Sequence, residues 1–490
     1  MPKSQSAIEF LTTYGFIFLI IAITLSLLYL FINFPRTILP FNCTIFSGFN
    51  CNDAIYTPNA TVGSQLFIIV SDMMPGTLNI TGFNAYMDFA NSTSGYCAAS
   101  IVTEGEKTYC IADISSAPRL GNMYSGTFKI IGNYCAQPLA NITTPSCKGG
   151  NGYVYSGSIN VQASKLNIGG IYYIPITITN TQNAAVPAHF QEEVSFNPSL
   201  INPLAERGDL GNIRFYYGGK EIYSWCESGC TSTSSDAIFW IRLPEAIPPS
   251  SSTVVDMYFL PTLVDYSGIH AGEAPELTTP YAKYDNGANV FNFYDSFSGT
   301  SLNTNIWDIG SQGTGALGTY NVSDGVNTTA NATSAINIHS SSEFGYPAYF
   351  EWYSAPFVQG TSSINRLQFG NSGTTPQEGE ALLMGAPGSV TIQYQTAAGT
   401  WAYSTSSPIP DSSGDNIYGV SANGTDVAAY FNYVPAVKAA TTYIPTNVSF
   451  GAFLNYESGI TSPKVYWVRI RAYPPDGIAP TISLGALTPA

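Results

Sequence analysis

The chain has 490 residues, a formal net charge of −15 and a charged fraction of 10%, compared with roughly 25% in ordinary soluble proteins. This balance excludes a nucleic-acid-binding protein, because no basic patch is available to replace phosphate counterions. The 33 Tyr and 27 Phe residues also exclude a largely disordered chain. Many aromatic residues among Gly, Ser, Thr and Asn favour β-sandwiches with uncharged polar surfaces.

An uncharged apolar segment runs from Phe10 to Pro35. As an α-helix it would be about 39 Å long, enough to cross a hydrocarbon core of about 30 Å. A secretory signal would have an apolar region of roughly 7–15 residues followed by small residues at a cleavage site, whereas INFPRTILPF follows here. We therefore predict a long hydrophobic assembly or transmembrane helix, residues 5–36, that stays on the mature protein.

The residues at the start of this segment, KSQSAIEF, resemble the class III signal of archaeal type IV pilin-like proteins. The resemblance implies a leader of residues 1–4, with Lys3 as its basic residue and cleavage between Ser4 and Gln5. Glu9 then becomes the fifth residue of the processed chain, where the family carries a glutamate. Ser4 departs from the Gly or Ala that usually precedes the cut.

A pilin-like chain of this kind is a structural subunit of an extracellular filament. The resemblance implies insertion in the membrane before assembly, cleavage by a prepilin peptidase, and contact with the pilus assembly machinery. Apolar helices of identical copies would then bury one another in a helical polymer. The alternative hypothesis is a monomeric, membrane-anchored cell-surface adhesin or lectin.

Eight cysteines fall as four pairs of near neighbours: Cys43 and Cys51, Cys97 and Cys110, Cys135 and Cys147, Cys226 and Cys230. Scattered histidines argue against a metal site, and an even cysteine count favours disulfides. Local pairs are favoured over other pairings, although the sequence leaves the connectivity open. Persisting disulfides imply an oxidising, extracellular compartment.

Ten N-x-S/T sequons are candidate glycosylation sites in a host that glycosylates. They are Asn42, Asn59, Asn79, Asn91, Asn141, Asn321, Asn327, Asn331, Asn423 and Asn447. A chain rich in Asn, Ser and Thr also forms such triplets by chance, so we expect some of them to carry glycans.

Beyond the apolar segment, short β-like runs alternate with Gly, Asn, Pro and Ser. Residues 43–164 contain six of the eight cysteines and are predicted to form a disulfide-rich, pilin-type β-sandwich. Residues 165–287 contain the alternating run IYYIPITITN. This second block resembles an uncharacterised β domain of prokaryotic surface proteins, which implies no known activity.

Residues 288–480 carry FYDSFSGTSLNTNIWDIG near their start and VYWVRIRAY near their end. They resemble a concanavalin/laminin-G-like jelly roll, in which the first and last strands pair. Asn423 and Gly424 predict a two-residue hairpin turn, and residues 481–490 are expected to be a short tail. The predicted fold is mainly β: a long N-terminal α-helix, then tandem β-sandwich domains, the last a concanavalin-like jelly roll.

Carboxylate patterns give no clear active site. A glycan hydrolase of this shape needs two carboxylates about 5–9.5 Å apart, which on one strand means carboxylates two residues apart. Glu378 and Glu380 form one such pair, but the sequence holds no alternating triplet. We therefore expect no enzymatic activity, no catalytic residue, no cofactor and no metal site, although a surface glycan hydrolase is retained as a weaker rival hypothesis.

Sugar binding would need an exposed aromatic ring beside polar groups. Trp352, Trp401 and Tyr403 are the candidate carbohydrate contacts, although a Trp in a sandwich is more often a core residue. The sequence thus predicts a surface adhesion protein whose partners are copies of itself and surface glycans, with no nucleic acid.

Overall fold

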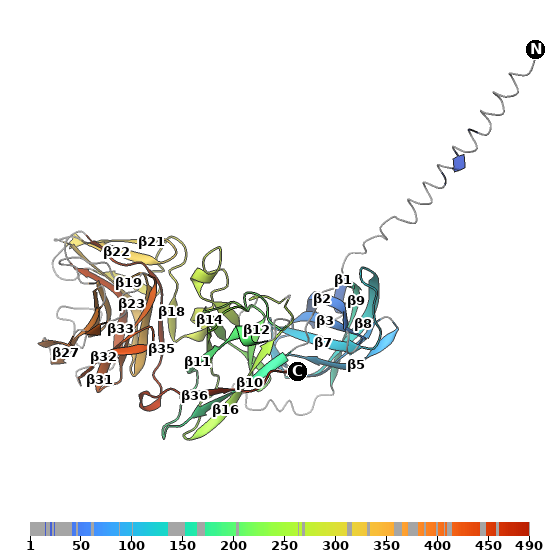
Figure 1. Ribbon diagram of the computed structural model, residues 1–490, viewed down its shortest axis with the longest axis horizontal. Helices are drawn as coiled ribbons and strands as arrows, with labels where there is room; N and C mark the ends of the chain where they lie inside the picture. Colours follow the sequence, from blue (N-terminus) through green and yellow to red (C-terminus); the bar gives the residue numbers. More distant parts are fainter. Residues whose placement is uncertain are drawn as a thin grey trace, which may run out of the picture. The chain divides into compact units, whose positions relative to one another are not determined.

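A computed structural model of the protein describes most of the chain beyond residue 41. The described residues are 42–45, 48–59, 63–87, 89–99, 101–135, 152–163, 172–201, 205–262, 264–266, 270–310, 316–330, 334–356, 365–370, 381–386, 389–397, 400–405, 407–408, 414–441, 447–456 and 460–489, with the single residues 15, 20, 21 and 24. The chain falls into two compact units, Met1–Leu166 and Asn167–Ala490. Strands dominate both units (Figure 1).

The predicted fold class is wrong in its helical part. Among the described elements the single α-helix is α2 (Gly287–Val290), which has four residues. Before the first strand, the structure describes Gly15, Ile20, Ile21 and Thr24, whose backbone is helical but which do not form an element. No described helix has the length and apolar character needed to span a membrane. The residues that the structure describes therefore form a nearly all-β fold, and no long N-terminal helix is among their elements.

The N-terminal unit is one continuous series of antiparallel strands in the order β1-β9-β8-β4-β5-β7-β3-β2, with β6 paired to β4. Its strands are β1 (Asn42–Ile45), β2 (Phe49–Asn59), β3 (Gly63–Asp72), β4 (Thr77–Met87), β5 (Ala90–Cys97), β6 (Ile101–Thr103), β7 (Lys107–Ile114), β8 (Met123–Cys135) and β9 (Tyr153–Gln162). Alternation places Phe83 of β4, Phe128 of β8 and Ile159 of β9 in the core.

Two predicted disulfides join strands of this unit. Cys43–Cys51 links β1 to β2, which stand at the two ends of the strand order. Cys97–Cys110 links directly paired residues of β5 and β7. These links constrain the unfolded chain and so stabilise a small sandwich. Cys147 lies outside the described residues, so its predicted pairing with Cys135 stays a prediction.

The C-terminal unit begins with a sandwich of two sheets, which we call the first sandwich. One sheet has the order β13-β12-β16-β10-β36 and the other β11-β15-β14-β17. Its elements are β10 (Tyr172–Asn180), β11 (Gln191–Phe196), η1 (Pro198–Leu200), β12 (Ile213–Tyr217), β13 (Lys220–Ile222), β14 (Ser224–Ser228), β15 (Ala237–Arg242), β16 (Ser251–Phe259), β17 (Ala271–Glu273) and η2 (Pro275–Leu277). Ile174, Ile176 and Ile178 alternate along β10 and are buried, as the sequence predicts.

The segment expected as a tail forms strands. β36 (Thr481–Leu484) and β37 (Thr488–Pro489) pair antiparallel with β10 and cover its edge. Between them Gly485 donates its N–H to the carbonyl of Pro175 (2.8 Å). A Cβ at Gly485 would lie 2.6 Å from Cγ of Pro175, so this close approach requires glycine. The C-terminal segment thus protects an uncharged edge strand that could otherwise pair with another chain.

The remaining strands form a jelly roll of two sheets (Figure 1). Its first sheet has the order β21-β22-β35-β24-β30-β31-β32, with β18 paired to β35 and β34 to β22. These strands are β18 (Phe293–Asp295), β21 (Thr319–Val322), β22 (Val326–Ala330), β24 (Ala348–Ser354), β30 (Asn416–Ala422), β31 (Asp426–Phe431), β32 (Val434–Ala440), β34 (Ile460–Thr461) and β35 (Val465–Ala472), followed by η3 (Pro475–Gly477). The pairing of β18 with β35 joins the first and last strands, as the jelly-roll resemblance implies.

The second jelly-roll sheet has the order β19-β23-β33-β25-β26-β27-β28, with β20 paired to β23 and β29 to β27. Its strands are β19 (Trp307–Gly310), β20 (Ala316–Leu317), β23 (Ser334–Gly345), β25 (Asn365–Gly370), β26 (Ala381–Ala386), β27 (Ser389–Ala397), β28 (Thr400–Tyr403), β29 (Ser407–Pro408) and β33 (Asn447–Tyr456). The two sheets enclose a core that includes Trp307, Ile338, Phe350, Trp352 and Val420.

The first jelly-roll sheet is packed on both faces. Phe350 and Trp352 point into the jelly roll, so the alternating Tyr349, Glu351 and Tyr353 point the other way. On that outer side a second hydrophobic cluster joins the jelly roll to the first sandwich. We call this contact the junction; its buried apolar members are Trp225, Trp240, Ala274, Val290, Phe291, Tyr294, Ile417 and Trp467.

The junction contains an ionic network of two arginines and two glutamates, and neither arginine is exposed. The guanidinium of Arg469 on β35 forms ion pairs with Glu227 (Nη1–Oε2, 2.7 Å) and Glu351 (Nε–Oε2, 2.7 Å), and its side chain is 0% exposed. Arg471 pairs with the other oxygen of Glu351 (2.8 Å). The rings of Phe291, Trp240 and Trp467 lie within 4.6–4.8 Å of the Arg469 guanidinium carbon, so cation–π attraction adds to the ion pairs.

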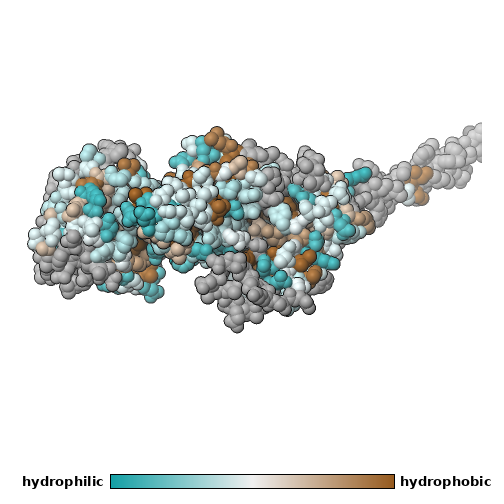
Figure 2. Space-filling model, turned by 90° about the horizontal axis from the view of Figure 1, so that it is seen from below, coloured by the Kyte–Doolittle hydropathy of each residue, from teal (hydrophilic) through white to brown (hydrophobic). Residues whose placement is uncertain are grey.

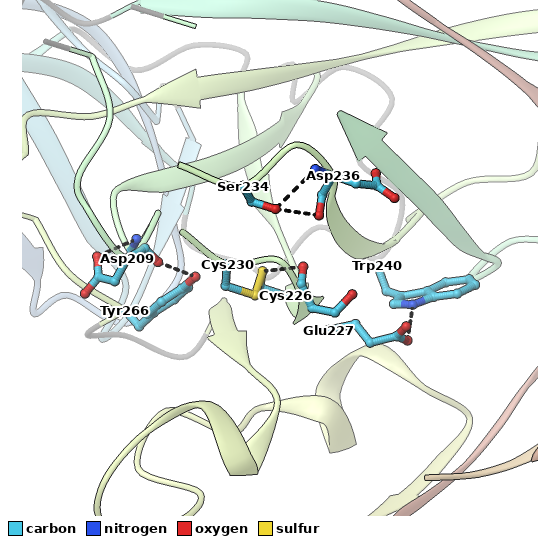
Figure 3. The surroundings of a disulfide bond; sticks show 10 residues. Asp209, Cys226, Glu227, Cys230, Ser234, Asp236, Trp240 and Tyr266 are labelled. Carbon is cyan, nitrogen blue, oxygen red and sulfur yellow. Dashed lines mark hydrogen bonds between the residues drawn. A yellow bond between two sulfur atoms is a disulfide. The ribbon is translucent and has the colours of Figure 1, made fainter. Parts of the chain in front are cut away.

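The third disulfide fixes the loop that carries one of these carboxylates. Cys226–Cys230 closes a short loop of the first sandwich, and Glu227 lies within it (Figure 3). Nε1 of Trp240 donates to Oε2 of Glu227 (2.8 Å), and the Tyr433 hydroxyl from the jelly roll donates to the same oxygen. Glu227 thus binds groups from both sandwiches, which holds them together.

Two other buried carboxyl groups of the first sandwich, Glu206 and Glu273, take no part in this ionic network. Oε1 of Glu206 and Oε1 of Glu273 are buried and have no hydrogen-bond partner among the described residues. Burial raises the pKa of Glu206 from 4.5 to about 8. Burial raises the pKa of Glu273 to about 7; Asp209 adds a smaller rise and Lys283 acts against it. These groups are therefore neutral acids in the folded protein at mildly acidic pH.

Replacing Glu351 with Gln should lower the free energy of unfolding by about 3 kcal/mol, since it leaves two buried guanidinium groups with too little negative charge. Burial opposes ionisation of Glu351, but Arg471 and Arg469 outweigh it and lower its pKa to about 2. Chemical denaturation followed by tryptophan fluorescence measures the change, because all 6 Trp residues lie in the C-terminal unit. The exposed Glu343 is the matched control; Glu343→Gln should change stability by less than about 0.5 kcal/mol. Equal effects of the two substitutions would contradict the network's role.

Stability should rise as the pH is lowered from 8 towards 5. A carboxyl whose pKa is higher in the folded than in the unfolded state opposes folding once it ionises, so its cost grows from pH 4.5 up to the folded pKa. Protonation of Glu206 and Glu273 between pH 8 and pH 5 should raise the free energy of unfolding by on the order of 2 kcal/mol or more, at roughly 1.4 kcal/mol per pKa unit. Below pH 4.5 the trend reverses, because Glu351 loses its ion pairs as its pKa of about 2 is approached. Midpoints of chemical unfolding, measured at several pH values across this range, give the slope of stability against pH. Glu206→Gln should flatten the slope and Glu343→Gln should leave it unchanged; an unaltered slope in Glu206→Gln would count against the assignment.

Candidate functional site

The three predicted carbohydrate contacts have different environments. Trp352 is 0% exposed in the jelly-roll core, so its prediction as a sugar platform is wrong: its strand turns that side chain inward. Tyr403 on β28 is 59% exposed. The side chain of Trp401 lies outside the described residues, although its backbone pairs with Gln395.

Strand register defines which residues share the outer face of the second jelly-roll sheet. Val390 and Ile392 of β27 point into the core, so Gln393 points away from it. Tyr403 is the direct partner of Gln393 across β27 and β28 and therefore lies on the same face. The first sandwich packs against the first jelly-roll sheet. It therefore does not cover this face of the second sheet, where the ring of Tyr403 is exposed.

Gln393 and Tyr403 form a polar pair on this face. Nε2 of Gln393 donates to the hydroxyl of Tyr403 (2.9 Å). Gln393 is only 7% exposed, and its Oε1 has no hydrogen-bond partner among the described residues. A buried amide oxygen without a donor is costly and is a ready acceptor for a ligand hydroxyl.

The other end of the same sheet also carries polar groups. Ile336 and Ile338 of β23 are core residues, so Asn337 and His339 lie on the outer face. His339 pairs with the exposed Asp308 of β19. Asn337 is 5% exposed and its Oδ1 also lacks a partner among the described residues.

This face, which we call the polar face, carries the exposed ring of Tyr403 towards one end and the amide, imidazole and carboxyl groups of Asn337, His339 and Asp308 towards the other. A ring can stack on the apolar side of a sugar while amides bond its hydroxyl groups. On the side of the molecule drawn in Figure 2, the coloured apolar residues form separate patches among hydrophilic ones. Within the described residues, no group of three or more His, Cys, Asp or Glu side chains could hold a metal ion.

Several predicted sites lie outside the described residues. These include the leader residues Lys3, Ser4, Gln5 and Glu9, and the sequons Asn141 and Asn331. The side chains of Asn42, Asn59 and Asn447 are likewise not described. Asn91 and Asn321 are exposed, whereas Asn79, Asn327 and Asn423 are partly buried.

Sequence reasoning missed Gln393 and Asn337. A usable signal was present, because Gln393 and Gln395 alternate with Ile392 and Tyr394 in SVTIQYQTA. Such alternation predicts a strand with one polar face, but only the register shows that Tyr403 lies beside Gln393.

Comparison of sequences finds one informative relative. No protein-family model matches the chain. The chain is 35% identical over 142 residues to the uncharacterized protein 562 of Sulfolobus islandicus rod-shaped virus 1, which covers 28% of this chain. The match spans about a quarter (24%) of that viral protein, so it does not establish a family.

Solved structures similar to the chain are jelly-roll enzymes. They include the endo-β-1,3-glucanase of Pyrococcus furiosus (9% identity, TM-score 0.31, 37% of this chain and 94% of that one). A second is the endo-β-galactosidase of Clostridium perfringens that releases GlcNAcα1-4Gal (13%, 0.32, 38% and 64%). A third is the β-glucanase of Bacillus licheniformis (15%, 0.29, 36% and 97%). At these values they give no argument about substrate or mechanism.

These neighbours nevertheless correct one expectation. The prediction that the chain is not an enzyme is withdrawn, because the solved proteins that resemble it are glycoside hydrolases. Its reasoning considered carboxylates two residues apart on one strand. A sheet also brings together side chains from different strands, as Asp308 and His339 show.

Proposed function

We propose that this protein is an extracellular surface protein that attaches to carbohydrates through the polar face of its jelly roll. The observation that carries the proposal is the pair of Tyr403 and Gln393. An exposed ring stands beside a buried amide whose oxygen lacks a donor among the described residues. Stacking and amide hydrogen bonds together are the usual means of holding a neutral sugar.

Three disulfides support the extracellular part of the proposal. Cys43–Cys51, Cys97–Cys110 and Cys226–Cys230 lie in two different compact units. Such bonds persist in oxidising compartments and are rare in the cytosol. A sparsely charged surface rich in hydroxyl and amide groups is also suited to neutral sugars.

The finer hypothesis concerns how the protein is displayed. We propose that it is a structural subunit of a pilus-like filament, inserted in the membrane before assembly and dependent on a prepilin peptidase and assembly machinery. This part rests on the sequence KSQSAIEF and its resemblance to a class III signal. A monomeric membrane-anchored adhesin or lectin is the competing form of the same surface role.

The full chain should bind a subset of an immobilised glycan panel that includes β-1,3-glucan, β-1,3-1,4-glucan and galactose-terminated oligosaccharides. Tyr403→Ala should weaken the binding about tenfold, which is about 1.4 kcal/mol, because the stacking ring is lost. The matched control is Tyr320→Ala on the first jelly-roll sheet, which removes a ring that is 40% exposed and should not alter binding. Release of reducing ends, measured in parallel, reports hydrolysis. No retained glycan, or equal losses in the two variants, would refute the proposed site.

Mass spectrometry of the mature N-terminus tests the filament hypothesis. If a prepilin peptidase acts after Ser4, surface material should begin at Gln5. Ser4→Gly supplies a residue that is usual before the cut and should give the same N-terminus. Intact Met1 in surface material would support the anchored monomer instead.

A further inference from the structure

Two acidic residues lie at the junction in addition to those that pair with arginine. Glu276 on η2 of the first sandwich accepts a hydrogen bond from Nε1 of Trp467 on the jelly roll (Nε1–Oε1, 3.4 Å). Its other oxygen, Oε2, is buried and has no partner among the described residues. Glu276 therefore presents an unpaired carboxyl oxygen within the contact between the two sandwiches.

Glu193 on β11 of the first sandwich is the second of these acidic residues. It pairs with Trp240 across β11 and β15, so both side chains point towards the jelly roll. Burial raises the pKa of Glu193, and Glu227 adds to the rise, while Arg471 and Arg469 act against it. Glu351 also raises it. Glu193 is thus near both arginines, which already have carboxylate partners.

The charges of the ionic network already balance. Arg469 and Arg471 supply two positive charges, and Glu227 and Glu351 supply two negative ones. Ionisation of Glu193 or Glu276 would therefore add uncompensated negative charge to a buried region, which is costly. The same carboxylates would be hydrated if the two sandwiches separated.

The other titratable groups around Glu193 and Glu276 do not make their ionisation favourable. Glu276 faces Glu227, Asp285, Tyr281, Tyr294, Tyr353 and Tyr466. Asp285 accepts hydrogen bonds from Trp225 and Tyr294, and Glu193 also lies near Glu192. The carboxyl groups among these neighbours repel each carboxylate that forms, whereas the tyrosines, whose pKa values burial raises, are uncharged and add no positive charge.

We propose that the junction is a pH-dependent contact, in which protonated Glu193 and Glu276 keep the two sandwiches docked and their ionisation weakens the docking. Burial raises the pKa of Glu276 from 4.5 to about 7. A group of this kind favours the docked state fully below pH 4.5, and the benefit is lost as the pH rises through about 7. Docking should therefore be tight in mild acid and weaker above neutrality.

Hydroxyl-radical footprinting of the full chain tests this, because the tryptophans report separately on the junction and on the core. Trp240 and Trp467 belong to the junction, whereas Trp307 and Trp352 lie inside the jelly roll. Between pH 5 and pH 8, oxidation of the junction tryptophans should increase at least about tenfold, the factor that one pKa unit of linkage gives. Trp307 and Trp352 should not change.

The variant Glu193→Gln/Glu276→Gln should remove most of that increase, since its amides cannot ionise. The matched control, Glu206→Gln/Glu343→Gln, changes a core and an exposed carboxyl outside the junction and should respond like the native chain. Equal oxidation of Trp240 at both pH values in the native chain would overturn the proposal. So would an undiminished increase in the junction variant, or a parallel rise at Trp352, which would indicate unfolding of the jelly roll.

Discussion

Burial of the Arg469 guanidinium is the interaction on which the C-terminal unit depends. An arginine cannot shed its charge, so a site that excludes water must supply anions and aromatic faces around it. Glu227 comes from the first sandwich and Glu351 from the jelly roll. Because neither sandwich holds the whole set, the charge is compensated only when the two are together, and the ion pairs specify how they dock.

This arrangement also determines which surface remains for a ligand. The outer side of the first jelly-roll sheet is occupied by Trp225, Trp240 and Phe291 of the junction. The polar face of the second sheet takes no part in that contact and carries the exposed ring of Tyr403. The position of the candidate site therefore follows from the docking of the first sandwich.

Much of this fold can be predicted from the sequence, because alternation and cysteine spacing are local signals. The strand with Ile174, Ile176 and Ile178 and three neighbouring disulfide pairs are confirmed. Other features depend on distant contacts. The run VYWVRIRAY forms the last strand of the jelly roll, but its local pattern does not show that a second sandwich covers the face with Arg469 and buries that side chain. Asn423-Gly424 belongs to a longer turn, since Ala422 pairs with Val427.

The candidate site and the junction depend on different chemistry, although both lie in one compact unit. Gln393 and Asn337 are amides, which keep the same charge at any pH and can bond neutral hydroxyl groups in acid and base alike. The junction instead concentrates carboxyl groups in a region where each charge needs a partner. With only 10% charged residues in the chain, much of the pH dependence of the C-terminal unit should then come from its interior. A surface protein built this way would retain its contacts to neutral sugars over a pH range in which its two sandwiches change how firmly they are joined.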